Sequence, residues 1–249
     1  MAQKCAICGA EINVFQSQKL TDGNYICRKT CKKLGMKEFD YVHADLPAVL
    51  AHNEQVKEGA KIFNELFLPR MDAKEKDKKL VKYGHVYVAP DLGLTALAEP
   101  EYKFFIFGKH WPRACVYRTG DLYRYDVKKE TKVVDGKEQT ETFIEYEFAN
   151  TPGMFTFRDK VTSGDAVVKY FNGVFGIQKT LANMGNNIGN QINAFKASAD
   201  AVKAAMNGEA DAQAKTAGAF DALNVAKYGD RTALNAKADA ALAPYKKAE

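Results

Sequence analysis

Four of the five cysteines in this chain lie within its first 31 residues, in two pairs that differ in spacing. Cys5 and Cys8 are separated by two residues and followed by Gly9, whereas Cys27 and Cys31 are separated by three. Thiolates at such spacings are zinc ligands, and four of them complete a tetrahedron with no open coordination position. The sequence therefore predicts one structural Zn²⁺ ion held by Cys5, Cys8, Cys27 and Cys31.

The sequence disfavours two other uses of these cysteines. A redox Cys-x-x-Cys motif normally follows a strand in a βαβ unit, and no such unit precedes Cys5. Two disulfides would need an oxidising compartment, but the start of the chain lacks the apolar run of a secretory signal. We therefore expect a cytoplasmic protein with reduced thiols. The fifth cysteine, Cys115, lies in a strand-like run and is expected to be a small buried side chain.

Basic side chains surround the second cysteine pair, which allows two interpretations. They could offset the charge of minus two on a zinc ion with four thiolates, or they could contact nucleic acid. Residues 1–37 carry seven Lys and Arg against two acids, a balance of +5 that falls to about +3 with the zinc-thiolate charge. Tyr25 is the one aromatic residue close to these basic residues in sequence. This favours the interpretation that they offset the charge of the zinc-thiolate centre. The candidate nucleic-acid residues are Arg28, Lys29, Lys32 and Lys33.

The residues around the cysteines predict their local structure. Gly9 favours a tight turn after the first pair. Asp22-Gly23 lies between strand-like residues and indicates a hairpin. The spacing of Cys27 and Cys31 would place both on one face of a helical turn, and Gly35 would end that helix.

These motifs also resemble a known domain. Cys5-x2-Cys8-Gly9, Asp22-Gly23-x-Tyr25-x-Cys27 and Cys31-Lys32-Lys33-Leu34 are similar to the N-terminal zinc-ribbon-like domain of a family of uncharacterised bacterial proteins, mainly from Gram-positive organisms. The resemblance covers about the first 35 residues. In that family a β region similar to pleckstrin-homology-like domains often follows. The resemblance therefore implies the metal and the order of domains, but no activity and no catalytic residues.

Further along the chain, the hydrophobic period changes from helical to strand-like. Asp45-Leu46-Pro47 predicts a helix start, and apolar residues recur at helical spacing until Pro69, where we expect the helix to end. A mixed charge run at 72–82 predicts a linker. Residues 85–158 then alternate with period two, which predicts six or seven short antiparallel strands, followed by a helix at 165–175.

Two segments of this β region are candidates for binding. The basic run 128–132 could contact an anionic lipid head group, but interrupting acids favour a solvated hairpin tip. His110-Trp111-Pro112 is expected to be an aromatic loop that covers a core edge or lines a binding surface.

The C-terminal third has a different pattern. Residues 167–206 place mostly apolar side chains alternately four and three apart, which predicts a heptad seam and self-association into a homo-oligomer. The competing interpretation is a break or hinge near Gly185 to Gly189, because each glycine lowers helix stability. After Gly208 the chain is alanine-rich and divided by glycines. It would form either helices folded back on the long one or a tail that orders on a partner.

These patterns predict an α+β protein. Its expected parts are a zinc-ribbon-like module (1–40), a helix and charged linker (41–83), a pleckstrin-homology-like antiparallel sandwich or open barrel with a closing helix (84–176), and a helical or partly disordered tail (177–249). With 46% hydrophobic and 27% charged residues, a net charge of +5 and no run of about 18 apolar residues, the chain is neither wholly disordered nor membrane-spanning.

No phosphate loop, dinucleotide fingerprint, metalloprotease motif or nucleophile elbow is present, so we expect no enzyme. The leading hypothesis is a non-catalytic zinc-containing binding or scaffold protein that acts through protein contacts. The alternatives are a nucleic-acid-binding zinc-ribbon protein and a structural subunit of a virion or other large assembly.

Overall fold

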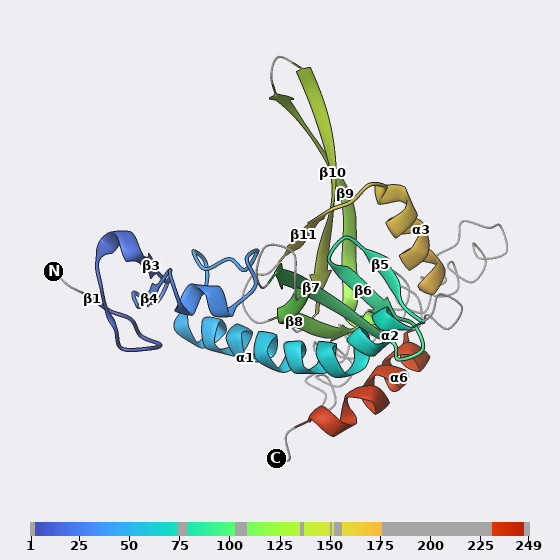
Figure 1. The fold of residues 1–249 in the computed structure, drawn as a ribbon, viewed down its shortest axis with the longest axis horizontal. Coiled ribbons are helices and arrows are strands. Elements are labelled where there is room, and N and C mark those ends of the chain that lie inside the picture. Colours follow the sequence, from blue (N-terminus) through green and yellow to red (C-terminus); the bar gives the residue numbers. More distant parts are fainter. Residues whose placement is uncertain are drawn as a thin grey trace, which may run out of the picture. The chain divides into compact units, whose positions relative to one another are not determined.

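The computed structural model describes residues 3–73, 79–102, 109–134, 137–149, 151, 156–175 and 231–246. They belong to two compact units, one of residues 1–164 together with 234–249 and one of residues 165–233. The fold combines helices with small antiparallel sheets (Figure 1).

The N-terminal part of the first unit is built from two short hairpins. Strand β1 (Gln3–Lys4) pairs with β2 (Glu11–Ile12), and β3 (Ser17–Lys19) pairs with β4 (Tyr25–Cys27). A 3₁₀ turn, Val14–Gln16, precedes β3, and another, Cys31–Leu34, follows β4 and ends at Gly35. The predicted hairpin at Asp22-Gly23 is confirmed, and Gly23 adopts a φ of +85°, which favours glycine.

Helix α1 (Leu46–Ile62) begins as predicted, because the Asp45 carboxylate accepts a hydrogen bond from the Ala48 N–H. The expectation that Pro69 ends the helix is wrong. A π-helical turn (Phe63–Phe67) continues into α2 (Leu68–Asp72), and the Leu68 N–H bonds to the Phe63 carbonyl, five residues earlier. Pro69 therefore lies in the first turn of α2, where a missing N–H is tolerated.

Seven antiparallel strands form two sheets. The first contains β5 (Val81–Tyr83), β6 (Val86–Ala89), β7 (Leu94–Tyr102) and β8 (Lys109–Arg118) in that order. The second contains β9 (Leu122–Val134), β10 (Lys137–Phe148) and β11 (Phe157–Lys160), with β10 in the centre. Among the described strands, no pairing closes these sheets into a barrel.

Three details of the strand prediction need correction. Strand β5 begins at Val81, inside the expected linker. The segment His110-Trp111-Pro112 belongs to β8 and is not a loop. Strands β9 and β10 are 13 and 12 residues long, so they are not short.

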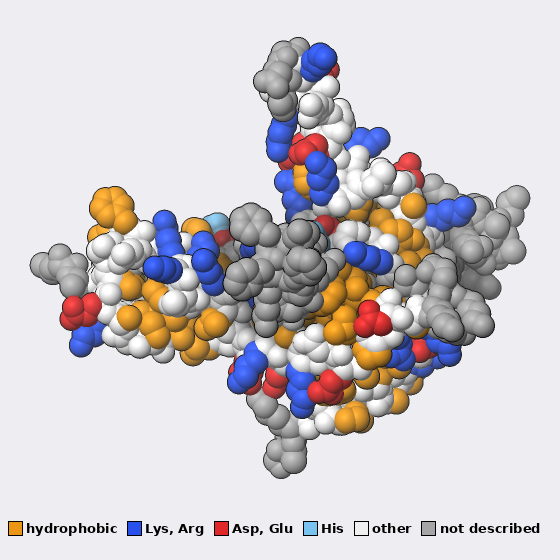
Figure 2. Space-filling view, in the orientation of Figure 1, with side chains coloured by type: hydrophobic (Ala, Val, Ile, Leu, Met, Phe, Trp, Pro, Cys, Tyr) orange, Lys and Arg blue, Asp and Glu red, His pale blue; other side chains and the backbone are white. Residues whose placement is uncertain are grey.

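The outer part of the β9–β10 ribbon has two strands only, because β11 pairs with β10 from Phe143 to Tyr146 (Figure 1). The basic run 128–132 lies on strand β9 in this ribbon, not at a tip. Basic and acidic side chains are mixed along this ribbon (Figure 2), and Glu141 forms ion pairs with both Lys132 and Lys160. The dense cation cluster that a lipid head group prefers is not formed by these residues.

Aromatic and small side chains form the core between the first sheet and the helices. Phe63 and Phe67 of the π-helical turn stack with ring centroids 5.3 Å apart, and Tyr87 and Trp111 contact Phe63 from the sheet. Gly59 brings α1 close to β8, because a Cβ there would collide with the Ala114 carbonyl. The core therefore holds α1 and its continuation against this sheet.

The C-terminal helix α6 (Thr232–Leu242) contributes to the same core, since Ala238 is fully buried in it. Two polar contacts also hold this end of the chain. Arg118 and Asp239 form an ion pair at 3.6 Å, and the Tyr245 hydroxyl donates a hydrogen bond of 2.7 Å to Glu65. This end of the chain folds back onto the first sheet, which neither C-terminal alternative anticipated.

In the second unit, helix α3 (Gly164–Val174) confirms the helix expected at 165–175. Its buried side chains, Val167, Phe171 and Phe175, recur every four residues. The remainder of the predicted 167–206 seam, and most of the predicted 177–249 tail, lie outside the described residues.

Candidate metal centre

The four N-terminal cysteines converge on one point. Their sulfur atoms all lie within 4.8 Å of one another, with Sγ–Sγ distances of 3.6 Å for Cys5–Cys31 and 3.8 Å for Cys8–Cys27. A tetrahedral ion with ligand distances of about 2.3 Å requires sulfur atoms about 3.8 Å apart, whereas a disulfide requires about 2.0 Å. The cluster is therefore positioned to hold a metal ion, as the cysteine spacing predicted.

The two pairs are presented by different local structures. Cys5 and Cys8 flank a tight turn that ends at Gly9, whose φ of +72° confirms the expected turn. Cys27 is the last residue of β4, and Cys31 is the first residue of the following 3₁₀ turn. The expectation that both lie on one helical turn is wrong, because pairing with β3 keeps Cys27 in an extended strand.

Although burial opposes ionisation, hydrogen bonds inside the cluster lower the pKa of Cys5 as well as that of Cys27. Cys27 Sγ accepts from the Cys31 N–H at 3.3 Å and lies 2.6 Å from the Thr30 hydroxyl. These contacts outweigh burial and lower the pKa of Cys27 to about 6. Burial and the neighbouring cysteines instead raise the pKa of Cys31. A bound cation would keep all four thiols deprotonated, so metal binding must release protons.

The fifth cysteine lies outside the cluster. Cys5, Cys27 and Cys31 are buried, whereas Cys8 is exposed. Cys115 is fully buried on β8, and burial raises the pKa of its thiol to about 12. Its expected character as a small core residue is confirmed.

The basic candidates lie mostly on the surface beside the cluster. Arg28, Lys29 and Lys33 are exposed, whereas Lys32 is half-buried with its Nζ 5.2 Å from the centre of the Tyr41 ring. None of these four cations forms an ion pair with an acidic side chain in the described part of the chain.

The segment that follows Cys31 fastens the cluster to α1. The Met36 N–H donates to His52 Nε2 at 3.1 Å, and the Phe39 ring stacks on the His52 ring with centroids 4.0 Å apart. Burial lowers the pKa of His52 to about 4. The imidazole is therefore neutral at pH 7 and can accept this hydrogen bond.

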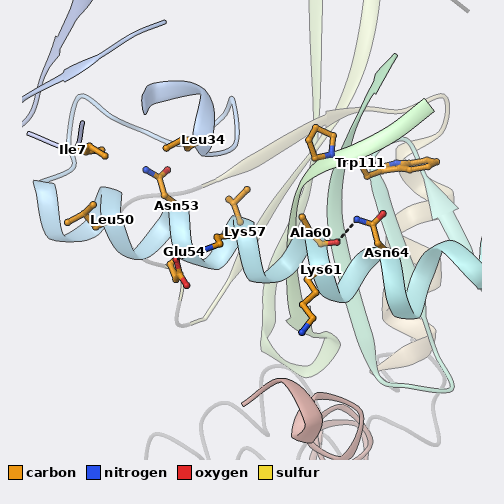
Figure 3. Close-up of a pocket in the computed structure, with 12 residues that line it drawn as sticks. Ile7, Leu34, Leu50, Asn53, Glu54, Lys57, Ala60, Lys61, Asn64 and Trp111 are labelled. Atoms are coloured by element: carbon orange, nitrogen blue, oxygen red, sulfur yellow. Dashed lines mark hydrogen bonds and ion pairs between the residues drawn. The ribbon is translucent and has the colours of Figure 1, made fainter. Parts of the chain in front are cut away.

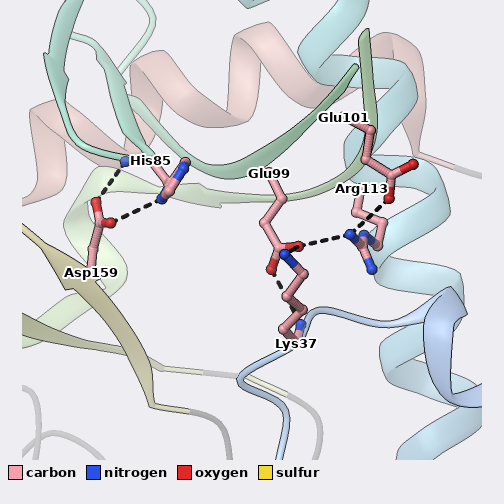
Figure 4. Close-up of polar contacts among 6 residues, drawn as sticks. All are labelled: Lys37, His85, Glu99, Glu101, Arg113 and Asp159. Carbon is pink, nitrogen blue, oxygen red and sulfur yellow. Dashed lines mark hydrogen bonds and ion pairs between the residues drawn. The ribbon is translucent and has the colours of Figure 1, made fainter. Parts of the chain in front are cut away.

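The same segment contacts the first sheet (Figure 4). The Lys37 N–H donates to the Glu99 carboxylate at 3.2 Å, and the Lys37 Nζ lies 3.7 Å from the same carboxylate. Arg113 forms an ion pair with Glu99 at 2.9 Å. Burial and the neighbouring Glu99 carboxylate raise the pKa of Glu38 to about 7. Lys37 is six residues from Cys31, so a metal ligand and this contact share one short segment.

A second polar contact joins the two sheets. Buried Asp159 on β11 accepts from the His85 N–H at 2.6 Å and lies 3.0 Å from His85 Nδ1 (Figure 4). The contact between the Asp159 carboxylate and the His85 ring raises the pKa of His85. His85 occupies the β5–β6 turn, so the contact fixes that turn against β11.

A groove with a volume of about 590 Å³ runs between the cluster, α1 and β8, and it is lined by apolar side chains together with polar and charged ones such as Glu54 and Lys61 (Figure 3). Ile7, which lies between two ligands, and Leu34, which follows a third, line one end. Trp111 and Pro112 line the other end. The sequence did not indicate this groove, because its walls come from three separate segments and carry no shared motif.

Among the described helices, none is long and apolar enough to cross a membrane. No curated protein and no solved structure matches this chain. One family model does match, over residues 3–44, and its family is described as a domain of unknown function, DUF4428. The matched residues include all four ligands. Residues 3–44 are thus a DUF4428 domain, and its cysteines form the candidate metal centre.

Proposed function

We propose that the metal is zinc and that residues 1–40 form a zinc-ribbon-like module. Four cysteine thiolates in tetrahedral spacing suit Zn²⁺, which has no geometric preference of its own. The arrangement of the ligands supports this, since a turn beside β1 and the end of β4 each bring one pair to the centre. Arg28, Lys29, Lys32 and Lys33 would then lie beside a centre with a charge of minus two.

We also propose that residues 84–176, together with β5, form a pleckstrin-homology-like domain. The support is topological: four strands in consecutive antiparallel order, then three more, then a helix. In this proposal the domain makes partner contacts and carries no catalytic residues.

The chain would then act in the cytoplasm as a non-catalytic binding or scaffold protein through protein contacts. One observation carries this proposal: all four ligands are side chains of the chain itself, which leaves a tetrahedral ion no position for a substrate. The groove between the module and β8 supports it, because the apolar side chains of Ile7 and Leu34 and the charged ones of α1 offer both kinds of contact to a protein partner.

Metal analysis of the purified full-length chain tests the first step. We expect one zinc per chain by mass spectrometry, and a loss of most of it in Cys27→Ser. Cys115→Ser is the matched control and should keep its zinc, because Cys115 lies outside the cluster. A zinc content well below one per chain, or iron in its place, would refute the zinc site.

Self-association through residues 167–206 remains a prediction of the heptad pattern. Deleting residues 177–249 is not a clean test, because it also removes α6 from the core of the first sheet. The full-length chain with Ile188→Asp and Ile192→Asp leaves α6 in place. Light scattering should show a smaller particle for this variant, and an unchanged mass would refute self-association through the seam.

A further inference from the structure

An aromatic side chain projects from the N-terminal module. Phe15 is 89% exposed and the adjacent Val14 is 67% exposed, both on the 3₁₀ turn before β3. The Asn13 side chain caps this turn by accepting from the Gln16 N–H. The turn is therefore ordered while its aromatic ring faces solvent, and such a ring offers a face on which a planar group can stack.

Two cations follow the strand that pairs beside this turn, although 13 positions separate Phe15 from Arg28. The Arg28 N–H donates to the Gln16 carbonyl at 2.9 Å, just beyond the pairing of Ser17 with Cys27 that ends the β3–β4 ladder. Phe15 and Arg28 therefore emerge at the same end of the ladder, and Lys29 follows directly.

Both cations are exposed and form no ion pair with an acidic side chain among the described residues. On the module, at the left of Figure 2, Lys and Arg side chains reach the surface close to hydrophobic ones. The structure thus brings an exposed aromatic residue to the same end of the β3–β4 ladder as two basic residues, which the sequence alone did not indicate.

We propose that Phe15, Arg28 and Lys29, named here the Phe15 surface, bind single-stranded nucleic acid. A base would stack on the Phe15 ring while Arg28 and Lys29 contact the flanking phosphates. A single strand suits the surface better than a duplex, because its unpaired bases can turn out onto the ring. This activity is additional to the protein contacts proposed above.

The metal centre limits the strength of this binding. With zinc bound, its four thiolates carry a charge of minus two close to Arg28, which weakens long-range attraction of phosphates. We therefore count only two phosphate contacts, for Arg28 and Lys29. Two contacts predict a slope of about −1.4 for log affinity against log salt, or about a sevenfold loss between 50 and 200 mM.

Fluorescence anisotropy of labelled oligo-dT and oligo-rU, about 15 nucleotides long, tests the proposal on the zinc-loaded full-length chain. Phe15→Ala should weaken binding about fivefold or more without changing the salt slope, and Phe15→Trp should restore binding. Arg28→Gln should instead reduce the slope by about 0.7. Leu50→Ala and Lys57→Gln, an exposed apolar and an exposed basic control on α1, should leave both quantities unchanged.

Zinc content, measured on every variant, identifies a variant that has lost its fold. A flat titration at low salt would overturn the proposal, as would equal affinity for duplex DNA or full binding by Phe15→Ala. None of these outcomes bears on the zinc content or the oligomer mass, so the proposed scaffold function stands or falls separately.

Discussion

The N-terminal module and the first β-sheet region reach order by different means. The module brings four cysteines together beside buried side chains such as Leu20 and Ile26, whereas the sheet packs Phe63, Phe67, Tyr87 and Trp111 into one aromatic core. A segment of about 40 residues rarely buries enough surface to fold unaided. The module should therefore depend on its metal, and the sheet on apolar packing.

The contact between these regions is partly polar. Lys37 reaches the Glu99–Arg113 pair, the Met36 N–H donates to His52, and the Phe39 ring stacks on the His52 ring. Such a contact adds little stability where it is exposed, but it fixes the orientation of the two parts. The regions should therefore be separable by experiment.

The largest effect should follow metal removal. Structural zinc contributes on the order of 10 kcal/mol in zinc-finger peptides, so a chelator should unfold residues 3–44 and leave β5–β8 intact. Hydrogen exchange would show this as loss of protection confined to the module. The emission of Trp111, the single tryptophan, should also change, because Ile7 and Leu34 line the same groove. Equal loss of protection in both regions would contradict the comparison.

A core substitution should produce the opposite pattern. Phe63→Ala removes a fully buried ring and should lower the free energy of unfolding by about 3–5 kcal/mol. Zinc content should not change, since the ring is remote from the cluster. Denaturant unfolding with metal analysis measures both quantities, and exposed Val42→Ala serves as the control with little effect on either.

Acid should weaken the junction through His52. Its pKa is about 4 when folded and about 6.5 when unfolded, so the unfolded chain binds the extra proton. The stability from the neutral ring is complete above about pH 6.5 and is lost as the pH falls towards 4, up to about 3 kcal/mol.

Thiol protonation also releases metal in acid, so the measurement needs a matched variant. His52→Gln keeps an acceptor for the Met36 N–H but does not titrate. With excess zinc, unfolding of the wild type should depend more steeply on pH between 6.5 and 4 than unfolding of His52→Gln. Parallel curves would rule out this role of His52.

The smallest effect is expected at Lys37. Its side chain is 70% exposed, so Lys37→Met should cost less than about 1 kcal/mol, and the backbone N–H to Glu99 remains. Denaturant unfolding would measure the cost. A loss of several kcal/mol would mean that the two regions are not separable in the way their packing indicates.

Features set by local chemistry could be predicted from the sequence. Asp45 and Pro47 lie at the start of α1 and predict it. Gly23 predicts the turn between β3 and β4, and the spacing of the four cysteines predicts that their sulfur atoms lie close together. Features set by long-range packing could not. The π-helical turn that accommodates Pro69 depends on burying both Phe63 and Phe67.

The same limit applies to the surfaces. The proximity of Phe15 to Arg28 depends on strand pairing between β3 and β4. The expected loop at Trp111 is part of a strand, because the pairing of β8 with β7 depends on residues that are distant in the sequence. The heptad pattern from Val167 still awaits the experiment on Ile188 and Ile192.

The burial of Ala238 in the core of the first sheet has a consequence for synthesis. A ribosome makes the chain from its N-terminus at roughly 5–20 residues per second, and α6 emerges well after strand β11. Until then the surface of the first sheet that Ala238 covers, including Gly93 and Leu94, must stay open to solvent. The nascent chain therefore passes through a stage with exposed apolar surface, in which a chaperone could bind before α6 arrives.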